Sequence, residues 1–127
     1  MEEQTIPTEQ PAEQTKPTNN HVSFEQFAAL EIRIGTIAAV EIVPDADKLL
    51  KLTVDLGEDS PRQIISGIRE FFPDEQVLVG KQCPFVANLV PRTIRGLESQ
   101  GMIMAAGEDS FALLEPSTPQ APGTRVR

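Results

Sequence analysis

The stretch LLKLTVDLG, residues 49–57, constrains the fold of this chain more than any other because it alternates apolar and polar side chains. Successive side chains of a β-strand point to opposite faces, so this alternation predicts a strand. The polar face carries Lys51, Thr53 and Asp55. The apolar face carries Leu50, Leu52, Val54 and Leu56. A strand with one polar face is typical of an antiparallel sheet that covers a core on one side.

Five further stretches have the apolar and β-branched composition of strands, and turn residues separate them. In order they are LEIRIGTIAAVEIV, RQIISGIR, KQCPFVAN, GMIMAAG and SFALLE. In the first of these, Leu30, Ile32 and Ile34 are expected to share one face, and Gly35 offers a place for a β-bulge. Short strands joined by turns in this way indicate a small β-barrel.

Two short helical segments accompany the strands. SFEQFAAL begins with Ser23 as a helix cap and has Gln26 three residues later, which is the capping-box pattern. FFPDEQVLVG predicts a helical turn that begins at Pro73. The order of elements predicts a mainly β protein: a five-stranded barrel of the oligonucleotide/oligosaccharide-binding (OB) fold, with a short N-terminal helix and a short helix between strands 3 and 4.

Residues 1–20 differ in composition from the rest of the chain. They are rich in Pro, Thr and Gln, and four glutamates against Lys16 give them a charge of −3. Ile6 is their only large apolar residue after Met1, so we predict a disordered acidic tail at 1–20 and one domain at 21–127. The tail lacks the patterns of secretory and transit peptides, and the chain lacks an apolar run of about 20 residues. We therefore expect a cytoplasmic protein that does not enter a membrane.

The residues that usually carry catalysis or hold a cofactor are scarce. His21 is the only histidine and lies beside the predicted tail, and Cys83 is the only cysteine. The two carboxylates of PDADKL are typical of a turn rather than of a cation site. Phosphate-binding glycine motifs are absent from the sequence. We expect no enzyme activity, no metal and no cofactor, with Cys83 as a small buried apolar residue.

A basic segment interrupts this acidic chain. The formal net charge is −8, yet no carboxylate occurs between Gln76 and Leu97, whereas Lys81, Arg92 and Arg95 do. The segment ends in ANLVPRTIRGLESQGM. Positive charge concentrated in one loop is the pattern expected of a phosphate-binding surface on an OB barrel.

The order of five stretches resembles a known family. They are LEIRIGTI, PDADKLLKLTVDLG, RQIISGI, VGKQCPFVANLVPRTIRGLESQGMIMAA and PGTRV. They resemble the tRNA-binding domain that occurs as a free-standing dimer, as an appendage of many methionyl-tRNA synthetases, and in synthetase-associated cytokine precursors. The resemblance implies an OB-type barrel, binding of tRNA by shape and backbone more than by sequence, and dimerisation or fusion to a partner. We expect a homodimer, with an aminoacyl-tRNA synthetase as the candidate partner. A methionyl-tRNA synthetase label would fit the family, but this sequence is too short for a nucleotide-binding catalytic domain and lacks its motifs, so we expect no enzyme.

Three arginines are candidates for contacts with tRNA phosphates. Arg92 and Arg95 can each form a bidentate contact, and Arg33, on the polar face of the first strand, is a further candidate. The alternative for these side chains is an ordinary solvated surface. Arg62, beside the turn EDSP, is expected to lie in a turn outside this interface.

Three residues of the basic segment and its end complete the predicted interface. Asn88 can both donate and accept, Ser99 can reach a sugar or phosphate, and Met102 can lie against a base or ribose. Each has a structural alternative: Asn88 as a turn former, Ser99 as a partner of nearby backbone, and Met102 as a filler of the core.

A second hypothesis comes from a different class of protein. Export-related, peptide-binding chaperones share this domain, and an acidic surface suits basic unfolded chains. Phe71, Phe72, Met102 and Met104 could then line an apolar groove for a peptide, with the core as the alternative place for these side chains.

Overall fold

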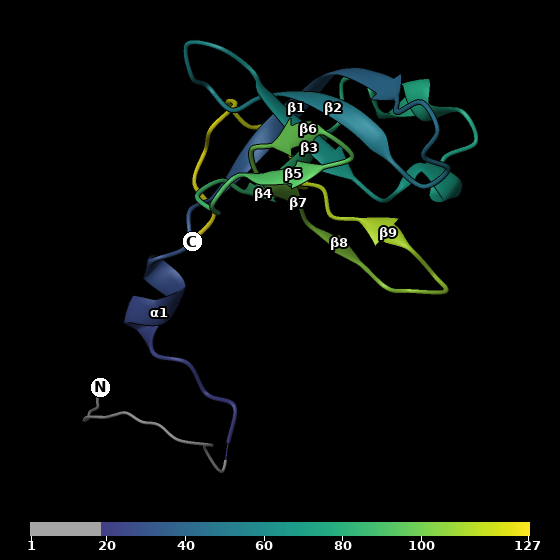
Figure 1. Cartoon of the computed structure of the whole chain (residues 1–127). Coiled ribbons are helices and arrows are strands. Elements are labelled where there is room, and N and C mark those ends of the chain that lie inside the picture. The colour runs from purple at the N-terminus through teal and green to yellow at the C-terminus, as the bar shows by residue number, and fades with distance from the viewer. Residues whose placement is uncertain (1–18) are drawn as a thin grey trace.

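The computed structural model describes residues 19–127, whose centre is a five-stranded antiparallel sheet in the order β3-β2-β1-β4-β7 (Figure 1). Every pairing in this sheet is antiparallel. Its strands are β1 (Ile32–Ile42), β2 (Leu50–Asp55), β3 (Arg62–Ser66), β4 (Gln82–Val86) and β7 (Met102–Ile103). The predicted fold class, a mainly β five-stranded barrel, is confirmed.

The sheet curls until β3 lies beside the segment that leads into β7. The Gln63 backbone N–H donates to the Gln100 side-chain oxygen at 2.9 Å, and the Gln100 N–H donates to the Gln63 carbonyl at 2.8 Å. Further along β3, the Ile65 N–H donates to Ser99 Oγ at 3.0 Å. These bonds satisfy the edge of β3 and nearly close the barrel.

The core confirms the alternation of residues 49–57. Leu50, Leu52, Val54 and Leu56 are all buried, and they pack with Phe85 from β4. Cys83 is also buried, as predicted. Full burial of a large aliphatic or aromatic side chain stabilises the fold by about 1.5–3 kcal/mol, so these residues make the alternating strand the centre of the barrel.

Two expectations for β1 were wrong. The register shift lies between Ile37 and Ala39, whereas Gly35 pairs regularly with Cys83. Gly35 is required for close packing, because an added Cβ would lie 2.7 Å from Val54 Cγ1. Leu30 precedes the strand and is exposed, so it does not share the buried environment of Ile32 and Ile34.

The N-terminal helix forms as predicted. α1 (Phe24–Ala28) has the complete capping box of Ser23 and Gln26, and none of its residues is buried. Figure 1 shows α1 projecting from the barrel. Between β3 and β4 the predicted helix is replaced by two 3-10 helices, η1 (Arg69–Phe71) and η2 (Glu75–Leu78).

Two small hairpins leave the barrel. The first is β5 (Arg92–Ile94) with β6 (Leu97–Ser99), and the second is β8 (Ala105–Ala106) with β9 (Ala112–Leu113). The C-terminal segment runs along β1, where the Ile34 N–H donates to the Thr124 carbonyl at 2.8 Å.

The predicted tail lies outside the described residues except for positions 19 and 20. Within residues 19–127, no helix combines the length and apolar character needed to cross a membrane.

Candidate nucleic-acid interface

The basic segment forms part of η2, then β4 and then the β5–β6 hairpin, which carries Arg92 and Arg95 but not Lys81. Arg92 pairs with Ser99 and Ile94 pairs with Leu97, which leaves a two-residue turn of Arg95 and Gly96. Both turn residues have positive φ, 54° at Arg95 and 79° at Gly96. Two positive φ angles match the twist of the flanking strands in a tight hairpin, although an arginine is unusual in this conformation. The turn therefore places an arginine at the exposed tip.

Arg92 and Arg95 are both exposed to solvent. Four other cations of residues 19–127 pair with carboxylates: Arg33, Lys51, Arg62 and Lys81. No such pair within these residues is formed by Lys48, Arg69, Arg125 or Arg127. Neither hairpin arginine forms an ion pair with any residue between 19 and 127. Their donors are thus available to an anionic ligand, although Asp47 lies in the same hollow as Arg95.

The hairpin tip meets the loop between β1 and β2. A hollow of about 570 Å³ is lined by Ile94 and Arg95 on one side and by residues 46–49, which include Asp47 and Lys48, on the other. Arg69 supports this loop from η1: its Nη1 donates to the Ala46 carbonyl at 3.2 Å. The β1–β2 loop and the loop after the fourth strand are the loops through which OB barrels bind oligonucleotides.

PDADKL forms a turn, and Asp45 has a positive φ of 61°. Among the residues that the structure describes, no cluster of three or more His, Cys, Asp or Glu side chains is placed to hold a metal ion.

Asn88 joins the start of the basic loop to the end of α1. Its Oδ1 accepts from the Glu31 N–H at 2.8 Å, and its Nδ2 donates to the Ala29 carbonyl at 2.7 Å. Arg33 is held nearby: its Nη1 donates to the Gly123 carbonyl at 2.9 Å, and Nη2 pairs with the Glu31 carboxylate at 3.3 Å. Both side chains are engaged in holding the chain itself.

Ser99 is buried, and its hydroxyl belongs to the barrel seam. Oγ accepts from the Ile65 N–H at 3.0 Å and donates to the Gly101 carbonyl at 3.2 Å. Met102 lies on β7 and is 48% exposed. Four of the six predicted site residues are therefore exposed: Asn88, Arg92, Arg95 and Met102. The amide of Asn88 is bonded within the chain at both ends, which leaves Arg92, Arg95 and Met102 as the exposed side chains without such bonds to residues 19–127.

Sequence reasoning missed the role of Arg62. It is the first residue of β3, not part of a turn, and its Nη1 donates to the carbonyls of Ala87 and Gln100. Its Nε and Nη2 bind the two oxygens of Glu58 at 2.9 and 2.8 Å, and this hydrogen bonding lowers the pKa of Glu58. The spacing of four residues between Glu58 and Arg62 is a signal for the ion pair. No local signal reveals the carbonyl partners.

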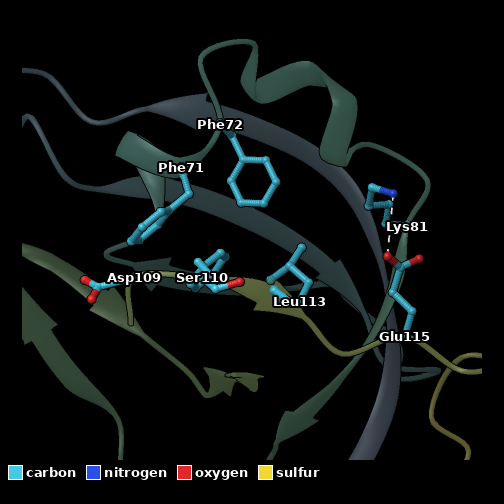
Figure 2. A pocket seen from close by; sticks show the side chains of 9 residues that line it. Phe71, Phe72, Lys81, Asp109, Ser110, Leu113 and Glu115 are labelled. Carbon is cyan, nitrogen blue, oxygen red and sulfur yellow. Dashed lines mark ion pairs between the residues drawn. The ribbon is translucent and has the colours of Figure 1, made fainter. Parts of the chain in front are cut away.

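A second hollow lies beside η1 and the β8–β9 hairpin (Figure 2). It measures about 490 Å³, and Phe71, Phe72 and Phe111 form its aromatic part. The rings of Phe71 and Phe111 stack with centroids 4.2 Å apart, and Phe72 meets Phe111 edge-on. Lys81 and Glu115 form an ion pair at one end, and Asp109 lies at the other (Figure 2). Phe71 and Phe72 line this groove as expected, whereas Met102 and Met104 do not.

Comparison with known proteins identifies the family. The domain described as "Putative tRNA binding domain" matches residues 32–125. This chain belongs to that family. The chain is 44% identical over 115 residues to the methionine–tRNA ligase of Methanocella arvoryzae, a match that covers 91% of this chain and 17% of the ligase. The chain thus spans about a sixth of that relative's length.

Solved structures share the fold. The crystal structure of a MetRS related protein from Pyrococcus horikoshii superposes with a TM-score of 0.78 at 32% identity, covering 86% of this chain and all of that one. The chaperone CsaA from Bacillus anthracis superposes with a TM-score of 0.75 at 26% identity, covering 85% of this chain and all of CsaA. The same domain architecture therefore occurs in a synthetase-related protein and in a chaperone.

Proposed function

We propose that this chain binds tRNA through the β5–β6 hairpin and the adjoining β1–β2 loop, and thereby assists an aminoacyl-tRNA synthetase without being an enzyme itself. The observation that carries the proposal is the pair of exposed arginines, Arg92 and Arg95, that have no carboxylate partner in residues 19–127. Arg95 and Lys48 line the hollow where the two loops meet, together with Asp47, and Arg92 lies at the base of the same hairpin. We therefore propose a cytoplasmic location for this chain, because tRNA is supplied to a synthetase there.

Recognition on this surface rests on the tRNA backbone. Arginine binds phosphate bidentately, and phosphate contacts fix position without reading base sequence. Met102 offers an apolar contact for a ribose or base. Asn88, Ser99 and Arg33 act by holding the loop, β6 and the start of β1 in place, since their polar groups are bonded within the chain. The net charge of −8 opposes long-range attraction to RNA, so association should be slow. The phosphate contacts themselves make the affinity decrease as salt is added.

Titration of fluorescent tRNA with the full chain tests the proposal. We expect anisotropy to rise with similar affinity for several different tRNAs, and with lower affinity for a single-stranded RNA of the same length. Addition of the chain to a methionyl-tRNA synthetase that lacks this domain should lower the KM for tRNA. Absence of tRNA binding at low salt would refute the function, whereas binding with an unchanged KM would refute only the synthetase partner.

A homodimer is the second part of the proposal. Exposed apolar side chains gather along α1, the residues that flank it and the loop after β4: Val22, Phe24, Phe27, Leu30, Leu89 and Val90. A second copy that buries this face would bring two hairpins onto one particle and raise the avidity for tRNA. Light scattering should give twice the chain mass at micromolar concentration, and Phe24→Glu should give a monomer. A wild-type monomer would refute the dimer.

Peptide binding is the alternative function, and the aromatic groove favours it. Phe71 is 40% exposed, and the segments that carry the groove are acidic, with Glu70, Glu108 and Asp109. An aromatic floor beside carboxylates suits a basic peptide with apolar side chains. The peptide would bind to the acidic groove beside the β8–β9 hairpin, whereas RNA would bind to the arginines of the β5–β6 hairpin. Binding of a basic peptide that is abolished in Phe71→Ala, together with no binding of tRNA, would favour this function.

A further inference from the structure

The segment that carries the hairpin leaves the barrel after Ala87 and returns to it at Gln100. Both of these residues point a carbonyl at the same guanidinium, because Nη1 of Arg62 donates to the Ala87 and the Gln100 carbonyls. The partners lie 25 and 38 residues from Arg62 along the chain. A single side chain on β3 thus joins the two ends of residues 88–99.

The two limbs of this segment are otherwise anchored to different parts of the barrel. The returning limb binds β3, where Gln63 Nε2 donates to the Glu98 carbonyl at 2.9 Å and the Ile65 N–H donates to Ser99. The departing limb binds the end of α1 through Asn88. Arg62 is the connection between β3 and the departing limb.

The guanidinium is itself held in one orientation. Glu58 occupies its other edge with two hydrogen bonds of 2.8 and 2.9 Å, so the remaining Nη1 donors face the carbonyls. A lysine ammonium has no planar fork and cannot bind a carboxylate bidentately while donating to both carbonyls. The arrangement requires an arginine, and the side chain is only 24% exposed.

We propose that Arg62 is a positioning residue that closes the base of segment 88–99 and so sets the place of Arg92 and Arg95 against the β1–β2 loop. This proposal rests on the proposed function for its consequence, because a misplaced hairpin matters only if the hairpin binds tRNA. The effect of Arg62 on the position of residues 88–99 does not depend on RNA binding. Arg62 stabilises the closed base of the segment without touching the ligand.

Hydrogen–deuterium exchange of the full chain, without RNA, tests the structural part. Arg62→Gln and Arg62→Lys should both speed exchange in residues 88–99, while β1 and β2 keep their protection. Lys81→Gln is the matched control, because it also removes one positive charge and one ion pair, of 3.7 Å, outside the hairpin loops. Unchanged exchange in residues 88–99 of Arg62→Lys would overturn the proposal.

Binding of tRNA tests the consequence. If the aligned hairpin is populated for only about a tenth to a third of the time in Arg62→Lys, the affinity falls about three- to tenfold. The salt slope should stay at the wild-type value, because Arg62 binds no phosphate.

Two binding results would overturn the positioning role. A slope lower by about 0.7–0.9 in Arg62→Gln would show that Arg62 contacts phosphate directly. Faster exchange with unchanged affinity would show that the closed base does not matter for binding. A wild type that binds no tRNA would instead refute the proposed function, and the exchange result would then decide the structural part by itself.

Discussion

Replacement of both hairpin arginines, Arg92→Ala with Arg95→Ala, should flatten the salt dependence of tRNA binding. Removal of one phosphate-binding cation lowers the slope of log affinity against log salt by about 0.7–0.9. Neither side chain is paired within residues 19–127, so the full effect of two cations is expected. The slope should therefore fall by about 1.4–1.8. Raising the salt from 50 to 200 mM should lower the affinity of both proteins for tRNA. The fold-decrease of the double variant should be about 7 to 12 times smaller than the fold-decrease of the wild type.

Anisotropy titrations at three salt concentrations measure this slope directly, with at least two different tRNAs. Lys81→Gln serves as the control for removal of charge, because Lys81 lies in the aromatic groove and already binds Glu115. Selectivity between the tRNAs should not change, since phosphate contacts carry no base sequence. Parallel salt dependences for the wild type, the double variant and the control would refute the assignment of the hairpin as the phosphate-binding element.

Three further changes have defined outcomes. Val90→Lys with Thr93→Lys adds two cations at exposed positions of the same loop, and should tighten tRNA binding and steepen its salt dependence in the same titrations. Gly35→Ala should lower the free energy of unfolding by about 1–3 kcal/mol in denaturant melts, because the new Cβ would overlap Val54; an unchanged midpoint would contradict the packing argument. Burial raises the pKa of Cys83 to about 11, so iodoacetamide at pH 8 should alkylate it only in the unfolded chain. The pKa of Cys83 in the folded protein lies above the ordinary value of 9.0, so the protonated thiol contributes fully to stability below pH 9. This contribution disappears as the pH rises towards 11, and Cys83→Ala should remove this pH dependence.

Part of the candidate site could be anticipated from the sequence, because the exposure of its arginines depends on residues close to them in the chain. A run of 22 residues without a carboxylate ends at Leu97, so Glu98 is the nearest acid to Arg95 in the sequence. The structure leaves Arg92 and Arg95 exposed and forms no ion pair between either of them and a residue of 19–127. The turn at Gly96 likewise follows from the need for positive φ between two short strands. The other polar candidates are decided by distant partners. Asn88 binds residues 57 and 59 positions away, and Ser99 binds a backbone N–H 34 positions away.

The sequence by itself determined the elements whose physical cause is periodicity or capping. Alternation in residues 49–57 placed four side chains in the core, and the Ser23–Gln26 pair set the start of α1. Tertiary structure alone decided what depends on packing between strands. Gly35 is needed because β1 passes over Val54 and Phe85 without room for a Cβ, and Arg62 holds two carbonyls that only closure of the barrel brings together. Contacts of this kind leave no local pattern, because each partner is placed by a different segment of the chain.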